Sequence, residues 1–169
     1  MSECCAVGGA TQAPPVMACP VSGTRSKRVD LLTVRSLVRH LPLGMPATAY
    51  YFCESPECDV VYFPSNTHAP VFRRSDLLVR VGAKEREDPI PVCYCFGFTR
   101  KEIEREVAQT GRSTIPERIT AEVKAGNCAC EVKSPSGKCC LGEIIRAVGA
   151  STIGSLPPRR TEALESEND

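Results

Sequence analysis

The chain has 169 residues, a formal net charge of +1 and 11 cysteines. Its 21 basic and 20 acidic residues are nearly balanced, which argues against a nucleic-acid-binding surface, since that needs a one-sided basic excess. No apolar run reaches the length of a membrane span, and residues 1–10 lack the basic and apolar regions of a secretory signal. A secreted disulfide scaffold is therefore disfavoured, and we expect reduced cysteines in the cytoplasm.

The arrangement of the cysteines favours metal ligation over disulfides. Their number is odd, so a disulfide framework would leave one thiol over. Cys93 and Cys95 are separated by a single residue, and Cys139 and Cys140 are adjacent. Cysteines this close share a metal ion more readily than they form a mutual disulfide.

The first 18 residues are small, contain proline and follow no regular pattern, so we expect residues 1–18 to be a flexible arm. Further along, Thr33 has the side chain of a helix cap. A helix that starts there would place apolar residues at i, i+3, i+4 and i+7, namely Val34, Leu37, Val38 and Leu41.

Two segments rich in aromatic and β-branched residues, 49–53 and 59–63, predict a β-hairpin. Cys53 and Cys58 stand at the two ends of its connector, which places a pair of possible metal ligands at the tip. The charged run 84–89 then predicts a link between two metal-binding modules. A solvated loop inside one domain is the alternative, because a charge run alone does not mark a boundary.

Helices are predicted in the second half. Thr99 and Glu102 form a capping-box pattern at the start of a helix that ends at Gly111. A second helix begins near Ser113 or Thr114, with Pro116 in its first turn. A third runs from about residue 139 to residue 149, and residues 151–169 are predicted to be a disordered tail. The fold class is therefore α+β.

Four cysteines of this half, Cys93, Cys95, Cys130 and Cys140, predict one shared metal centre. The first two precede the capped helix and the last stands at the start of another, so free amide groups and the positive helix ends would favour thiolates. Spacing alone favours an iron–sulfur cluster over zinc, because zinc knuckles usually separate paired cysteines by two to four residues. Zinc remains the alternative.

Longer motifs resemble known families. The run Val92-Cys93-Tyr94-Cys95-Phe96-Gly97-Phe98-Thr99 resembles the bacterioferritin-associated ferredoxin-like 2Fe–2S domain. More broadly, residues 19–148 resemble the N-terminal domain of CopZ-type copper chaperones, which carries one zinc and one 2Fe–2S cluster. The motifs behind this resemblance are Tyr51-Phe52-Cys53-x4-Cys58-Asp59-Val60-Val61-Tyr62-Phe63, Arg80-Val81-Gly82-x-Lys84-Glu85-Arg86-Glu87 and Pro135-Ser136-Gly137-x-Cys139-Cys140.

The resemblance implies a 2Fe–2S cluster on Cys93, Cys95, Cys130 and Cys140 in a helical module, residues 89–150. Cys128 and Cys139 are then spare thiols that pack nearby. It also implies a zinc-ribbon-like β-hairpin module, residues 19–88. The family leads one to expect Cys-x-x-Cys at its start, whereas this chain has Ser22 at the second position. We therefore predict zinc on Cys19, Cys53, Cys58 and either Cys5 or Cys4.

For function, the resemblance implies one-electron transfer in copper homeostasis, with a redox or copper-handling protein as partner. The Met-x-Cys-x-x-Cys motif of the copper-carrying domain does not occur in the sequence. The alternative is a non-redox thiolate metal-binding chaperone or sensor, since soft thiol pairs such as Cys4–Cys5 and Cys139–Cys140 favour Cu(I). No catalytic constellation is present, so we expect no enzyme activity.

Overall fold

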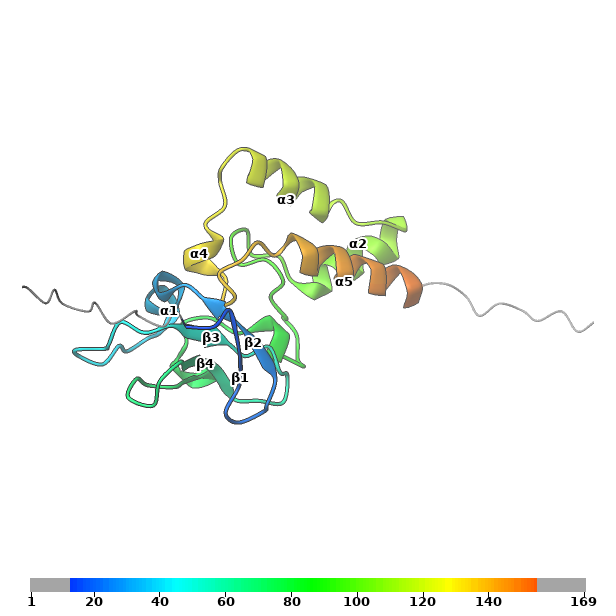
Figure 1. Ribbon diagram of the computed structural model, residues 1–169. Coiled ribbons are helices and arrows are strands. Elements are labelled where there is room, and N and C mark those ends of the chain that lie inside the picture. Colours follow the sequence, from blue (N-terminus) through cyan, green and yellow to red (C-terminus); the bar gives the residue numbers. More distant parts are fainter. Residues whose placement is uncertain (1–12, 155–169) are drawn as a thin grey trace, which may run out of the picture.

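The first half of the chain folds into an antiparallel sheet, and the second half into helices that lie beside it (Figure 1). The structure, a computed structural model, describes residues 13–154. Within this range the sheet is five-stranded, in the order β1-β2-β3-β4-β5. Its strands are β1 Val16–Ala18, β2 Arg25–Val29, β3 Tyr50–Phe52, β4 Val60–Pro64 and β5 Phe72–Arg73.

The predicted hairpin is confirmed as β3 and β4, which pair with Tyr51 opposite Phe63. The module is nevertheless larger than the predicted hairpin, because β1 and β2, which the residue pattern did not predict, extend the sheet beyond β3. Residues 16–18, predicted as part of the arm, form β1 because they pair with β2. Sequence patterning missed β2 because its residues, Arg-Ser-Lys-Arg-Val, carry three charges and bury only Ser26 and Val29.

The first helix, α1, spans Leu31–Leu37 and follows β2 directly. The predicted cap, Thr33, was wrong: Asp30 caps the helix by accepting a hydrogen bond from the Leu32 amide at 2.8 Å. The Thr33 hydroxyl instead donates to the carbonyl of Glu131 at 2.6 Å. The helix also ends earlier than predicted, since Val38 is extended and Leu41 is 40% exposed.

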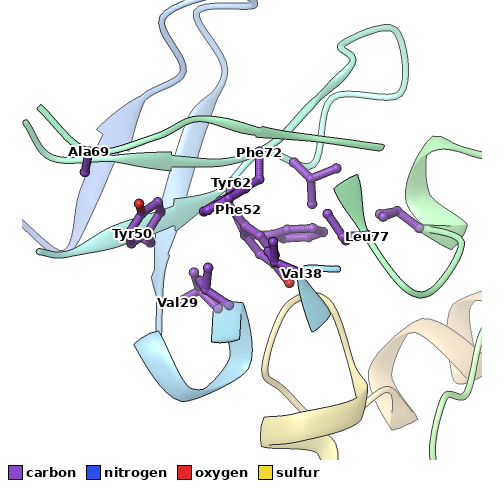
Figure 2. Packing of buried hydrophobic residues seen from close by; sticks show 11 residues of the cluster. Val29, Val38, Tyr50, Phe52, Tyr62, Ala69, Phe72 and Leu77 are labelled. Carbon is purple, nitrogen blue, oxygen red and sulfur yellow. The ribbon is translucent and has the colours of Figure 1, made fainter. Parts of the chain in front are cut away.

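The two faces of the sheet bury different residues. Tyr50 and Phe52 of β3 face the first cluster, which Figure 2 shows packed with Tyr62, Phe72, Leu77 and α1 neighbours such as Val38. Tyr51, which alternates with them, faces a second cluster that contains three cysteines. Because side chains alternate along β3, Tyr50 and Phe52 pack in an aromatic core on one face of the sheet, and Tyr51 packs beside the cysteines on the other face.

The helical half contains α2 Arg100–Thr110, α3 Ile115–Lys124, α4 Cys130–Lys133 and α5 Leu141–Gly154. The capping box of Thr99 and Glu102 and the end of α2 at Gly111 are confirmed. The predicted end at Gly149 was wrong, because α5 continues to Gly154 and the Ser151 hydroxyl bonds back to the carbonyl of Ala147. Within residues 13–154, no helix combines the length and apolar character that crossing a membrane requires.

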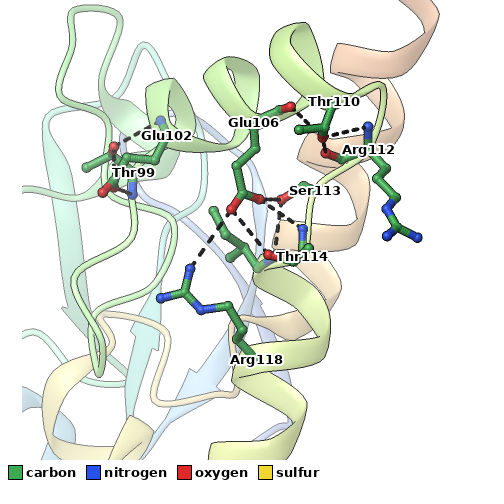
Figure 3. Close-up of polar contacts among 9 residues, drawn as sticks. Thr99, Glu102, Glu106, Thr110, Arg112, Ser113, Thr114 and Arg118 are labelled. Carbon is green, nitrogen blue, oxygen red and sulfur yellow. Dashed lines mark hydrogen bonds and ion pairs between the residues drawn. The ribbon is translucent and has the colours of Figure 1, made fainter.

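The turn between α2 and α3 is fixed by one carboxylate (Figure 3). Glu106 accepts hydrogen bonds from the Ser113 hydroxyl at 2.6 Å and from the Thr114 amide at 2.9 Å. The hydrogen bond from Ser113 is the main reason that the pKa of Glu106 lies below its ordinary value. Glu106 on α2 therefore caps the start of α3 and holds the two helices together.

Direct contacts join the first half of the chain to the second. The buried Tyr62 hydroxyl of β4 donates to the carbonyl of Pro135 at 2.7 Å. The Gly82 amide donates to the Tyr94 hydroxyl at 2.8 Å, and that hydroxyl donates in turn to the carbonyl of Arg80 at 3.1 Å. A Cβ atom on Gly82 would lie 2.0 Å from the Pro91 carbonyl oxygen, so only glycine permits this approach.

Replacing Gly82 with alanine should therefore destabilise the fold by about 2 kcal/mol or more, because the new methyl group overlaps a backbone oxygen. Chemical denaturation measures the change. Gly142→Ala in α5 is the matched control, since no atom lies within 4 Å of its added Cβ, and helix propensity should make it neutral or stabilising. Equal effects in both variants would contradict the close approach at Gly82.

Removing the Glu106 carboxylate should lower the free energy of unfolding by about 1 kcal/mol, because Thr114 and Ser113 lose their acceptor. Thermal or chemical unfolding of Glu106→Ala tests this. Glu104→Ala on the same helix removes the same charge from an exposed position and should change stability by less than half as much.

Candidate metal centres

Three buried cysteines meet at one end of the sheet and form the sheet centre: Cys19, Cys53 and Cys58. Cys19 lies in the β1–β2 turn, and the other two flank the β3–β4 turn. Their Sγ atoms all lie within 4.8 Å of one another, and those of Cys19 and Cys58 are 3.9 Å apart. Tetrahedral zinc with Zn–S bonds of about 2.3 Å holds its sulfurs about 3.8 Å apart, so this spacing fits zinc.

The turn after Cys19 brings backbone and side-chain donors to the sheet centre. The Cys19 carbonyl accepts from the Gly23 amide at 2.9 Å, and the Cys19 amide donates to the Thr24 carbonyl at 2.9 Å. Burial raises the pKa of Cys19, but hydrogen bonds from the Ser22 hydroxyl and from the amides of Ser22 and Val21 outweigh it and lower the pKa to about 7. Cys19 is therefore predisposed to ionise and bind a cation.

A buried lysine lies behind the sheet centre. Lys84 is only 1% exposed, and its ammonium group donates to the carbonyls of Ser55 at 2.8 Å and Cys58 at 2.9 Å. Desolvation lowers the pKa of Lys84, while the thiols of Cys53 and Cys58 act against that shift. The ammonium group thus fixes the turn between two of the cysteines, and its charge opposes the negative charge of thiolates.

The environment of Lys84 bears on the predicted link at residues 84–89, because this first residue of the run lies in a short 3-10 helix and is buried rather than solvated. The sequence analysis did not predict that Lys84 contacts the turn of the sheet centre. Its place in the family motif Gly82-x-Lys84 was the one feature of the sequence that pointed to a structural role. Cys5 and Cys4, the two candidates for the fourth zinc ligand, lie outside the described residues.

The second group, the helical centre, consists of two pairs of thiols: Cys93 with Cys140, and Cys95 with Cys130. The Sγ atoms of Cys95 and Cys130 are 3.6 Å apart, and the Cys93 and Cys140 thiols are hydrogen-bonded to each other. Cys93, Cys130 and Cys140 are buried and Cys95 is partly buried. The structure thus arranges the four residues as two pairs, and their joint ligation of one centre stays a prediction.

Amide groups of loops solvate these sulfurs. The loop from Cys93 to Phe98 closes on itself, because the Phe98 carbonyl accepts from the Val92 and Cys93 amides, each at 3.0 Å. The Cys95 sulfur accepts from the Ala129 amide at 3.4 Å. At the start of α2, where donors were predicted, the Glu102 amide instead donates to the Thr99 hydroxyl, and the Arg100 amide donates to the Ile90 carbonyl at 2.9 Å. The donors therefore come from loops, whose conformation the residue pattern did not predict.

The thiols of the helical centre cannot all ionise together without added positive charge. The hydrogen bond from Cys140 is the main reason that the pKa of Cys93 falls to about 6, and the same bond raises the pKa of Cys140. Burial, followed by the hydrogen bond with Cys95, raises the pKa of Cys130 to about 12. One thiol of each pair therefore keeps its proton unless a cation compensates the charge.

Two further cysteines border the helical centre. Cys139 is exposed and Cys128 is partly buried, and their charges act on the Cys130 thiol. Neither belongs to the two thiol pairs. The choice of Cys130 and Cys140 as ligands in place of these neighbours remains a prediction.

Comparisons with known proteins identify the family to which the chain belongs. A family model for a CopZ-type zinc-binding domain matches residues 16–78. The copper chaperone CopZ of Archaeoglobus fulgidus is 40% identical over 125 residues, which are 74% of this chain and 58% of that protein. The chain thus spans little more than half the length of this curated relative. The X-ray structure of the A. fulgidus CopZ N-terminal domain matches with a TM-score of 0.59 and 38% identity, covering 77% of this chain and 96% of that one.

Loss of the Lys84 charge should weaken zinc binding at the sheet centre by about 10–100-fold, the usual effect of removing a group that orients metal ligands. Competition with a chromophoric chelator measures the affinity of Lys84→Met. Arg86→Met is the matched control: Arg86 pairs with Glu57 at the surface, so the same loss of charge should leave the affinity nearly unchanged. Equal losses in the two variants would rule out a specific effect of Lys84.

Proposed function

Because the chain belongs to the family of the CopZ N-terminal domain, we propose that it is a metal-binding protein of copper handling with two thiolate centres. The sheet centre holds a structural zinc on Cys19, Cys53 and Cys58 with one further ligand. The helical centre holds a 2Fe–2S cluster on Cys93, Cys95, Cys130 and Cys140.

The observation that carries the cluster proposal is the division of the second set of thiols into two pairs. A mononuclear zinc site needs all four sulfurs mutually about 3.8 Å apart. In the part of the chain that the structure describes, no three of these four sulfurs lie within 4.8 Å of one another, whereas the sheet centre meets that limit. A dinuclear cluster needs two thiolates on each of two irons, so paired thiols suit it better than zinc.

When bound, a 2Fe–2S cluster takes up and releases one electron at a time. The residues of the chain would set how readily it does so. Hydrogen bonds to the sulfurs, such as that from the Ala129 amide to Cys95, favour the more negative, reduced state. The apolar cluster around Ile103, Val107 and Ile144 excludes water from the buried side of the centre. We infer that a redox or copper-handling protein partner exchanges the electron.

A non-redox role in binding metal is the second candidate, and two observations favour it. The curated relative is named a copper chaperone. In this chain, the exposed Cys139 lies next to the buried Cys140, and soft thiols of this kind suit Cu(I). In this case the helical centre would take up thiophilic ions in place of a cluster.

Metal and acid-labile sulfide analysis after anaerobic purification separates the two functions. We expect about two iron and about two sulfide ions per chain together with about one zinc. Cys93→Ser should abolish the visible absorption, because it breaks one thiol pair. Cys128→Ser is the matched control and should retain it, because Cys128 belongs to neither pair.

Colourless protein that takes up Cu(I) or zinc in both centres would refute the cluster and favour the non-redox function. Loss of colour in Cys128→Ser would instead show that Cys128 is a ligand, and the choice of the third ligand would then be wrong.

A further inference from the structure

The sheet centre has three cysteines, and a fourth side chain stands where the missing ligand belongs. We propose that the Ser22 position supplies this corner through oxygen, either its own hydroxyl or a water molecule that the hydroxyl holds. The metal is then held by three thiolates and one exchangeable oxygen, with no fourth cysteine. This inference rests on the proposed zinc site and names the ligand that the zinc proposal leaves open.

Distances are the first support. The Ser22 hydroxyl oxygen lies 3.5 Å from the Sγ atom of Cys53. With Zn–S bonds of about 2.3 Å and Zn–O bonds of about 2.1 Å, a tetrahedral zinc separates oxygen from sulfur by about 3.6 Å. The distance from the hydroxyl to Cys53 therefore matches that of a fourth ligand.

The turn holds the hydroxyl in this position. The Thr24 amide donates to the Ser22 oxygen at 3.3 Å, and the Cys19 carbonyl accepts from the Gly23 amide at 2.9 Å. Ser22 thus occupies the same knuckle position that a second cysteine takes in Cys-x-x-Cys. Backbone geometry, rather than a long flexible side chain, aims the oxygen at the thiols.

Accessibility and charge determine what this corner can do. The three cysteines are buried, with exposed fractions of 0–4%, whereas Ser22 is exposed. A neutral oxygen binds zinc more weakly than a thiolate does, because it is a harder ligand without charge. The fourth position consequently faces solvent and exchanges, so an incoming thiolate can displace the oxygen without breaking any bond to Cys19, Cys53 or Cys58.

Substitution of the metal by Co²⁺ tests the ligand set, because thiolate-to-cobalt charge-transfer absorption grows with each coordinating thiolate. We expect the wild-type protein to show the absorption of three thiolates, and Ser22→Cys to show an added fourth. Ser22→Ala should keep the wild-type charge transfer, with water in the vacated position. Cys4→Ala and Cys5→Ala, purified under reducing conditions, should match the wild-type protein.

Zinc release provides a second, independent readout. Transfer of zinc to a chromophoric chelator should be about 10-fold or more slower for Ser22→Cys than for the wild-type protein, since a closed site lacks an exchangeable corner. Added 2-mercaptoethanol should raise the charge-transfer absorption of the wild-type cobalt protein and leave that of Ser22→Cys unchanged.

The outcomes separate this inference from the zinc proposal. If the wild-type protein binds Co²⁺ through four thiolates, and Cys4→Ala or Cys5→Ala removes one of them, the fourth ligand is a cysteine. That result overturns the proposal for Ser22 and leaves the zinc proposal intact. A wild-type protein that binds neither zinc nor Co²⁺ at the sheet centre overturns both.

Discussion

Like-charged thiolates packed into a small buried volume repel one another, and much of this fold is arranged around that constraint. In the helical centre, each pair of thiols retains a proton in the absence of a cation, as the opposite pKa shifts of Cys93 and Cys140 indicate. In the sheet centre, the ammonium group of Lys84 lies behind the cysteines and contributes positive charge of its own. The cost of gathering the thiols is therefore offset by a buried cation, by amide donors and by the metal itself.

The two centres share one structural support. Residues 131–137 connect them, because the Thr33 hydroxyl of α1 bonds to the carbonyl of Glu131 and the Tyr62 hydroxyl of β4 bonds to that of Pro135. At Gly137, a Cβ atom would lie 2.8 Å from the Thr33 hydroxyl. The segment between Cys130 and Cys140 is thus held against the sheet, and the position of two cysteines in the helical centre depends on α1 and β4.

Local sequence signals predicted those parts of the fold that local interactions form. The capping box at Thr99 and Glu102, the end of α2 at Gly111 and the β3–β4 hairpin each depend on residues near one another in sequence. The strands β1 and β2 were missed because pairing, and not the alternation of apolar residues, holds them together. Thr33 was misread as a helix cap because its partner, Glu131, lies far away in sequence.

The same distinction applies to the metal centres. Cysteine spacing and family resemblance predicted which thiols would gather, and the structure places Cys19, Cys53 and Cys58 together. The groups around them could not be predicted in this way. Lys84 reads as part of a charged surface run, and Ser22 reads as a missing ligand, because neither burial nor hydroxyl direction is visible in a residue pattern.

The approach of Gly82 to Pro91 has a consequence for how the two candidate centres are positioned relative to each other. Two residues beyond Gly82, Lys84 holds the turn of the sheet centre, and two residues beyond Pro91 stands Cys93 of the helical centre. The two backbones are in contact without an intervening side chain. No side-chain rearrangement can therefore absorb a displacement of either backbone segment. A displacement of the backbone at Gly82 therefore moves the segment that leads to Lys84 and the segment that leads to Cys93 together.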